Sequence, residues 1–211
     1  MDVEFIGQSV EYIGGYGGTE TIVSAARTCT QTMRSDDKPA KVSEYFVRSL
    51  LNRGHMSPIE FGFADMRLEV DRAIQAQYLR HRHFSFNVES TRFCDYRKKP
   101  LRFVTKPPEG MDVPEMCVDC LEEYCALGAR LYESWANAGV SRDYLRKFLV
   151  LALASRMRMA GNLRSWFEML PKRLDKAAHA EAREVAGMIL KTLKAKFKGV
   201  FDGIGGGDEA T

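Results

Sequence analysis

The feature that most constrains the fold is an alternating segment between Glu60 and Val70. Its apolar side chains recur at every second position: Ala64, Met66, Leu68 and Val70. This period of two predicts a strand with one apolar face. Asp71 follows at once and is a favourable N-cap, so a helix should begin there. A sheet with one apolar face needs a covering layer. We therefore expect an α+β fold in which helices pack on a small antiparallel sheet, within a single domain.

Other segments of the chain supply the remaining elements. The first dozen residues alternate loosely and predict a strand, and Thr19 is placed to cap a helix. The other predicted helices are Pro39–Arg53, Pro114–Gly139, Ser141 to about Ala154, Asn162–Lys172 and Asp175–Phe197, with a strand at Arg156–Ala160. We expect residues 1–202 to form one domain, and residues 203–211, a Gly-rich tail, to be disordered.

The composition is that of a globular protein. The chain has 211 residues, of which 45% are hydrophobic and 28% charged, enough for one sizeable core. The beginning of the chain lacks the pattern of a signal peptide, and the longest apolar run, Phe148–Ala154, is too short to span a membrane. An odd number of cysteines, five, favours a reducing compartment. We therefore expect a cytoplasmic protein without membrane partners.

The charge of the chain is unevenly distributed. The net charge is only +3, which argues against a general nucleic-acid binder. Residues 80–106 nevertheless hold eight cations against two anions, and residues 141–173 hold the same numbers. Two separate basic stretches predict an anionic partner that is contacted from two sides.

The first candidate site is the segment RHRHFSFNVESTR, Arg80–Arg92. Gln77 and Arg80 share a face of the predicted helix, and Asn87, Ser90 and Arg92 add donors after it. Arginine offers a planar fork of donors that suits a phosphate or a pyrimidine carbonyl. The alternative interpretation is a helix end with favourable cations, followed by a polar loop.

Two further segments place polar side chains at helix ends. GHMSPIE, Gly54–Glu60, puts a His, a Ser and a Glu on one turn, although a Ser-Pro turn is also ordinary chain punctuation. The segment from Asn162 to Arg183 distributes polar residues around helix starts, as a salt-bridged helix pair would also do.

Other kinds of site are disfavoured by spacing. The cysteines of CVDC, Cys117 and Cys120, lie in a helical segment without a second ligand pair, so we interpret them as core or groove thiols and expect no metal. GGYGG is followed by no phosphate-loop lysine, and its spacing is not that of a dinucleotide-binding motif.

Taken together, these motifs resemble the flavin-dependent thymidylate synthases, the thymidylate synthase complementing protein family. The family signature, RHR followed by seven residues and Ser, matches Arg80-His81-Arg82 and Ser90. The remaining matches, in chain order, are AAR at 25–27, Gly54, His55, Ser57, Pro58, Glu60, Gln77, Arg92, Asn162-Leu163-Arg164, Arg173, Ala178, His179, Glu181 and Arg183. The resemblance covers nearly the whole chain.

The resemblance implies a specific reaction. Such an enzyme methylates dUMP to dTMP, with methylenetetrahydrofolate as carbon donor, NADPH as reductant and FAD as hydride carrier. The family is homotetrameric, with active sites shared between subunits. The partners would thus be dUMP, folate and three further copies of the chain, without nucleic acid.

The resemblance also assigns roles to residues. Those implied to hold dUMP are Gln77, Arg80, Ser90, Arg92, Arg146 and Arg173, of which Arg80, Ser90 and Arg173 are the implied catalytic residues. Those implied to line the flavin are His55, Ser57, Glu60, Arg80, His81, Arg82, Asn87, Asn162, Arg164 and His179. An arginine near a uracil carbonyl could polarise the ring as hydride adds.

The chain departs from the family pattern inside its main motif. The family usually has N-E-x-S-x-R-Y, whereas this chain has Asn87-Val88-Glu89-Ser90-Thr91-Arg92-Phe93, with the acid moved by one position. One alternative is therefore a related flavoenzyme that transfers another one-carbon unit, such as hydroxymethyl, to a deoxypyrimidine monophosphate. A second alternative is a non-enzymatic nucleotide or nucleic-acid binding module, which would bind oligonucleotides with a steep dependence on salt.

Overall fold

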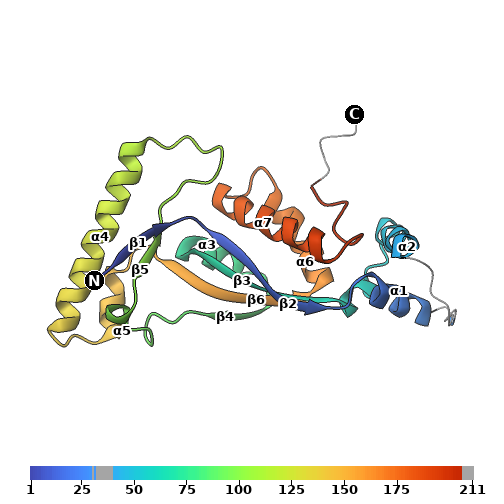
Figure 1. The fold of residues 1–211 in the computed structure, drawn as a ribbon, viewed down its shortest axis with the longest axis horizontal. Coiled ribbons are helices and arrows are strands. Elements are labelled where there is room, and N and C mark those ends of the chain that lie inside the picture. The colour runs from blue at the N-terminus through green and yellow to red at the C-terminus, as the bar shows by residue number, and fades with distance from the viewer. Residues whose placement is uncertain (30, 32–39, 206–211) are drawn as a thin grey trace. The chain divides into compact units, whose positions relative to one another are not determined.

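The structure is a computed structural model that describes residues 1–29, 31 and 40–205, without the side chains of residues 40–43. The helices are α1 (Thr19–Thr28), α2 (Ala40–Asn52), α3 (Arg72–Tyr78), α4 (Glu115–Asn137), α5 (Arg142–Leu145), α6 (Leu163–Leu174) and α7 (Ala180–Lys196) (Figure 1). The strands are β1 (Val3–Ile6), β2 (Ser9–Tyr16), β3 (Phe63–Asp71), β4 (Ser85–Val88), β5 (Leu101–Val104) and β6 (Ala154–Asn162). Short 3-10 helices cover Ser57–Phe61, Tyr96–Lys98 and Arg146–Phe148. Within the described residues, no helix has the length and apolar character needed to cross a membrane.

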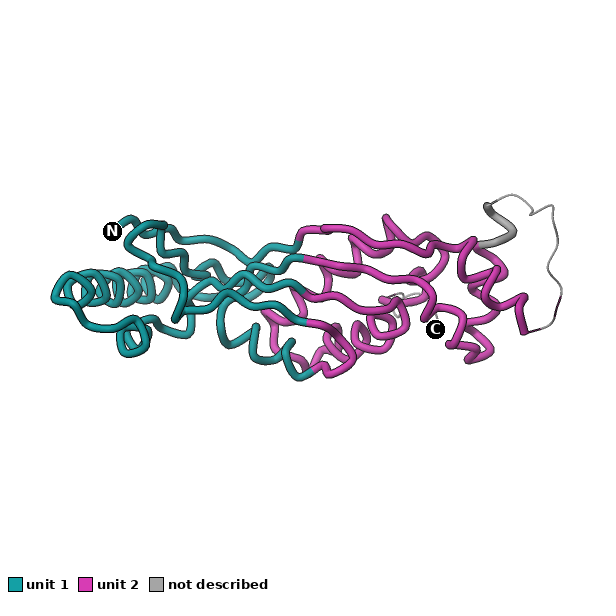
Figure 2. Tube along the Cα trace, turned by 90° about the horizontal axis from the view of Figure 1, so that it is seen from below, with its two compact units in different colours: residues 1–10, 67–80, 86–158 teal, residues 11–66, 81–85, 159–211 magenta. Residues whose placement is uncertain are grey.

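The strands form two sheets, and the chain divides into two compact units. One sheet has four strands in the order β2-β3-β6-β4, and the other pairs β1 with β5. Unit 1 comprises residues 1–10, 67–80 and 86–158, and unit 2 comprises residues 11–66, 81–85 and 159–211 (Figure 2). Each strand of the larger sheet contributes residues to both units, so neither unit is a separate stretch of the chain.

Unit 1 is built around the small sheet and the long helix α4. β1 runs parallel to β5, with Val3 opposite Leu101 and Ile6 opposite Val104. The core of this unit is formed by Tyr96, Leu101, Phe103, Cys125, Ala129, Tyr132, Leu145 and Leu153. Cys125, Ala129 and Tyr132 recur at helical spacing, which places one face of α4 in this core.

Unit 2 contains α1, α2, α6 and α7 (Figure 1). α6 packs on α7, and the indole Nε1 of Trp166 on α6 donates hydrogen bonds to the carbonyl oxygens of Ala64 and Gly161. α7 buries the side chains that recur along one face of the helix: Ala182, Val185, Ala186, Ile189, Leu190 and Leu193. Burial of this apolar face stabilises the unit far more than intrinsic helix propensity does.

The structure confirms the α+β class and corrects several details. The alternating segment is β3, whose residues at even positions from 64 to 70 are buried. The parallel pair β1–β5 was not expected, because the prediction was of an antiparallel sheet alone. The helix predicted from Ser141 to Ala154 is shorter: α5 and the 3-10 helix after it end at Phe148. Most of the tail that we predicted to be disordered, residues 206–211, lies outside the described residues.

Candidate functional site

α3 presents the first group of predicted site residues. Asp71 caps this helix, because its carboxylate accepts a hydrogen bond of 2.7 Å from the backbone N–H of Ile74. Gln77 lies in the last turn of the helix and is half-buried. The helix ends at Tyr78, so Arg80 lies just beyond it and is exposed. Arg80 forms no ion pair with any residue that the structure describes, which leaves its guanidinium available for an anion.

The segment after β4 is held by interactions within unit 1. The backbone N–H of Arg92 donates to Ser90 Oγ at 3.3 Å, and Arg92 Nε lies 2.6 Å from an Asp143 carboxylate oxygen. Glu89, the acid displaced relative to the family pattern, accepts a 2.9 Å hydrogen bond from the Tyr96 hydroxyl. Burial and the nearby Glu89 charge raise the pKa of Tyr96, so this hydroxyl keeps its proton. Glu89 thus has a structural partner inside its own unit.

A cationic pocket of about 340 Å³ lies in unit 1 around Arg146. Its lining consists of Arg72, Thr91, Arg146, Lys147 and Leu149. The pocket brings Arg146 next to Thr91, the residue between Ser90 and Arg92 of the main motif. Arg72 and Lys147 were missed by the sequence reasoning. Their signal was the basic character of the segment at 141–173 and the position of Arg72 at the start of α3.

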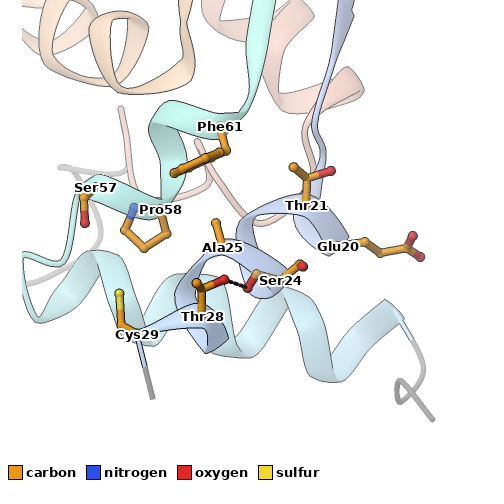
Figure 3. A pocket seen from close by; sticks show the side chains of 9 residues that line it. All are labelled: Glu20, Thr21, Ser24, Ala25, Thr28, Cys29, Ser57, Pro58 and Phe61. Atoms are coloured by element: carbon orange, nitrogen blue, oxygen red, sulfur yellow. Dashed lines mark hydrogen bonds between the residues drawn. The ribbon is translucent and has the colours of Figure 1, made fainter. Parts of the chain in front are cut away.

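A second pocket, of about 680 Å³, lies in unit 2 beside the Ser-Pro turn. Figure 3 shows the side chains that line it: Glu20, Thr21, Ser24, Ala25, Thr28, Cys29, Ser57, Pro58 and Phe61. The lining combines hydroxyl groups with apolar side chains, and α1 supplies most of the hydroxyl groups. Ser57, one of the residues implied to line the flavin, lies in the lining of this pocket. Cys29 and the hydroxyls of α1 were not predicted.

Arg164 connects the Ser-Pro turn to α6. Its Nη1 lies 2.6 Å from Glu60 Oε1, and its Nε lies 2.7 Å from Glu168 Oε1. Asn162 caps α6, since its side-chain oxygen accepts hydrogen bonds of 2.8 Å from the Ser165 N–H and 2.9 Å from the Ser165 hydroxyl. Asn162 therefore positions the helix that carries Arg164.

Arg173 and His81 meet in unit 2. Arg173 Nε donates a 2.8 Å hydrogen bond to His81 Nε2. Burial, and then the charges of Arg173 and Lys172, lower the pKa of His81 from 6.5 to about 4. His81 is therefore a neutral acceptor at physiological pH.

The remaining predicted residues do not gather around either pocket. His55, Arg82 and Asn87 are exposed and line neither pocket. His179 is exposed at the start of α7, with Nδ1 3.6 Å from Glu181 Oε2. Among the described residues, the structure therefore joins predicted site residues in separate pairs, Arg164 with Glu60 and Arg173 with His81.

The cysteines do not form a reactive centre in the described part of the chain. All five are free thiols. Burial and the charge of Glu89 raise the pKa of Cys94, which makes its thiolate scarce at neutral pH. Among the described residues no group of three or more His, Cys, Asp or Glu side chains could hold a metal ion.

The two pockets offer different chemistry: cations in one unit, hydroxyl groups and apolar surface in the other. The fold and pockets thus define an α+β protein whose described residues form a cationic pocket in unit 1 and a hydroxyl-lined pocket in unit 2.

Comparison with known proteins gives the family. The family model described as "Thymidylate synthase complementing protein" matches residues 12–197. The chain is 27% identical to a probable flavin-dependent thymidylate synthase of Mycobacterium phage L5, covering 87% of this chain and 79% of the relative. It is 27% identical to the flavin-dependent thymidylate synthase of Corynebacterium glutamicum (91% and 82% covered) and 28% identical to that of Thermotoga neapolitana (89% and 86%).

The chain belongs to the thymidylate synthase complementing protein family. The resemblance inferred from the motifs is thereby confirmed, as is the prediction that the chain is an enzyme of this class.

Proposed function

We propose that this enzyme methylates dUMP to dTMP, with methylenetetrahydrofolate as carbon donor, NADPH as reductant and FAD as its cofactor. Family membership supports the flavin and the nucleotide product, because the relatives are named flavin-dependent thymidylate synthases. The observation that carries the proposal is the pocket at the Ser-Pro turn, since Ser57 and Pro58 of the motif line it together with α1.

The pocket of unit 2 fits part of a flavin nucleotide. Thr21, Ser24, Thr28 and Ser57 offer hydroxyl groups suited to ribose or ribityl oxygens, and Pro58 and Phe61 offer apolar surface suited to a ring. Arg164, which lies on α6 and pairs with Glu60 of the same turn, would contact the pyrophosphate. When bound, the cofactor supplies hydride transfer, and the protein supplies position and electrostatics.

The cationic pocket of unit 1 fits the phosphate of dUMP. Arg72, Arg146 and Lys147 provide three positive charges, and Thr91 lines the same pocket. A phosphate monoester carries nearly two negative charges at neutral pH. We assign Arg72 and Lys147 to this role beside Arg146, with Ser90 and Arg92 on the adjoining segment.

Arginines would then act on the uracil ring. Arg80, exposed and without an ion pair among the described residues, would bind a ring carbonyl and withdraw electron density as hydride arrives. Arg173 would hold the nucleotide from α6. The raised pKa of Cys94 agrees with a reaction that uses no enzyme thiolate as nucleophile.

We further propose that the enzyme is a homotetramer and works in the cytoplasm. α4 exposes a row of apolar side chains at helical spacing, among them Met116 (71% exposed), Tyr124 (59%) and Leu127 (45%). Several exposed apolar side chains on one helix are typical of a protein–protein interface. The five free cysteines support a reducing compartment.

One experiment tests the reaction. The purified chain should be yellow with the visible absorption of oxidised flavin, or become so when loaded with FAD. Incubation with dUMP, methylenetetrahydrofolate and NADPH should then yield a product with the mass of dTMP. A hydroxymethylated product would favour the related flavoenzyme, and a colourless protein that cannot be loaded with FAD would refute the proposal.

The assignment of Arg72 has its own test. Arg72→Ala should lower dUMP affinity about tenfold or more, because a charge-assisted hydrogen bond to phosphate is lost. Isothermal titration with dUMP and with deoxyuridine separates the phosphate contribution from that of the ring. If Arg72→Ala weakened both ligands equally, Arg72 would not contact the phosphate.

A further inference from the structure

His81 and Arg173 are joined by a contact that links two motifs of the sequence. His81 belongs to the RHR motif, and Arg173 lies more than ninety positions later on α6. Arg173 Nε is the donor and His81 Nε2 the acceptor, at 2.8 Å in a part-buried setting. A guanidinium that donates through Nε has its plane fixed, because Nε is the atom nearest the aliphatic stem.

The imidazole of His81 also packs against an aromatic cluster that consists of Phe84 and Trp166. Its ring meets Phe84 edge-to-face with centroids 6.4 Å apart, and Phe84 meets Trp166 edge-to-face at 4.6 Å. Trp166 is fully buried and anchored by its two hydrogen bonds to backbone carbonyls. Trp166 and Arg173 are seven residues apart on α6 and so share a face. Trp166 and Arg173, the first and last residues of this series of contacts, therefore both lie on α6.

The direction of the hydrogen bond determines the protonation of His81. Nε2 can accept from Arg173 only if it carries no proton, so the neutral ring must carry its proton on Nδ1. A protonated His81 would lose this acceptor and would place a third cation beside Arg173 and Lys172. The lowered pKa of His81 agrees with a ring that stays neutral from about pH 5 upward.

We propose that His81 is a positioning residue that orients the guanidinium of Arg173 for the nucleotide, through a neutral Nε2 acceptor. This inference rests on the proposed function, which makes Arg173 a dUMP ligand. His81 itself then need not touch dUMP.

The protonation state can be measured without any ligand. The chain has only four histidines, so long-range proton–nitrogen NMR spectra of ¹⁵N-histidine-labelled protein can resolve His81. At pH 6 we expect its Nε2 to be unprotonated and its Nδ1 to carry the proton. In Arg173→Ala the pKa of His81 should rise toward its ordinary value. A His81 that is charged at pH 6 in the unaltered protein, or that bears its proton on Nε2, would overturn the proposal.

The positioning role is tested by dUMP affinity in a double-mutant cycle. His81→Phe keeps a ring against Phe84 but removes the acceptor, and should lower dUMP affinity about tenfold, the effect of one charge-assisted hydrogen bond. His81→Gln offers an amide oxygen near the place of Nε2 and should restore most of the affinity. In the Arg173→Ala background, His81→Phe should change the affinity less than about twofold.

His83→Phe is the matched control, because His83 is exposed and its ring takes no part in the aromatic cluster of Phe84 and Trp166. Its dUMP affinity should equal that of the unaltered protein. If His81→Phe cost the same affinity with and without Arg173, His81 would contact dUMP directly and the inference would be wrong. If the unaltered protein bound no dUMP, the proposed function would fail, while the NMR result would still decide the His81–Arg173 contact.

Discussion

Several cationic site residues already have partners within the chain. Arg164 pairs with two carboxylates, Arg92 with Asp143, and Arg173 donates to His81. Exposed pairs between arginine and carboxylate contribute little to stability, so we expect these pairs to act mainly by holding the arginines in position. Arg80 and Arg146 differ, because neither forms an ion pair with any residue in the described ranges. Neither guanidinium has to leave a described carboxylate before it can meet an anion.

The substitution Glu60→Gln tests whether such an ion pair matters for stability or for ligand binding. Glu60→Gln removes one carboxylate from Arg164, whose side chain is 40% exposed, and we expect the free energy of unfolding to change by less than about 1 kcal/mol. FAD affinity should fall several-fold, because Arg164 then loses the partner that holds it at the turn. Urea denaturation and flavin fluorescence titration measure the two quantities. A large loss of stability with unchanged flavin binding would show a purely structural pair.

Gly161 leaves room for the aromatic cluster of Phe84 and Trp166, because it has no side chain. A Cβ at this position would lie 2.7 Å from Cδ1 of Phe84 and 3.0 Å from its Cε1. Gly161→Ala should therefore displace Phe84 from Trp166 and cost about 1–3 kcal/mol of unfolding free energy. Thermal and urea unfolding measure the loss. Full stability in Gly161→Ala would mean that Phe84 moves freely.

At the scale of elements, the helix starts are set by local side chains. Asp71 and Asn162 each cap the helix that follows a strand of the larger sheet, α3 after β3 and α6 after β6. Both helices carry predicted site residues near their ends. The caps therefore determine where Gln77 and Arg164 lie relative to their strands.

Asp71→Ala should destabilise the protein by about 1 kcal/mol through the lost cap, and by more if its burial leaves the Ile74 N–H unsatisfied. dUMP affinity should fall as well, because α3 presents Gln77. Asp71→Asn keeps a capping oxygen and should retain most of the stability. Equal losses in the two variants, measured by urea unfolding, would show that the negative charge of Asp71 matters and not the cap.

Gly187 lowers the stability of α7, because glycine is unfavourable inside a helix. A Cβ at this position would meet no atom within 4 Å, and the residue lies in the middle of the helix. Gly187→Ala should stabilise the protein by about 0.5–1 kcal/mol, because alanine restricts the unfolded chain more than glycine does. A raised midpoint of urea unfolding with unchanged turnover is the expected result. A lowered midpoint would indicate that another subunit packs against this face.

At the scale of the whole molecule, His81 should make stability depend on pH. Its pKa is about 4 in the folded protein and about 6.5 when unfolded, so between these values the unfolded chain binds a proton that the folded chain does not. Its contribution is complete above pH 6.5 and is lost progressively as pH falls toward 4. His81→Gln should flatten this part of the curve, as urea midpoints at several pH values would show. His83→Phe should leave the pH dependence of stability that comes from His81 unchanged.

Much of the fold followed from local pattern. The period of two in β3, the cap at Asp71 and the long helix α4 all depend on neighbouring residues, and the structure confirms each. The extent of α5 and the parallel pairing of β1 with β5 could not be predicted from local sequence pattern. Helix length near Phe148 is decided by packing on α4, and strand pairing joins segments far apart in the chain.

The sequence by itself determined the family of this protein and the residue types of its site, because motif order and spacing are properties of the chain. Only the tertiary structure decided which of those residues meet. It grouped Arg72 and Lys147 with Arg146, it placed the hydroxyls of α1 beside Ser57, and it joined His81 to Arg173. The physical reason is that a pocket or a hydrogen bond depends on distances in space, which packing sets and sequence spacing does not.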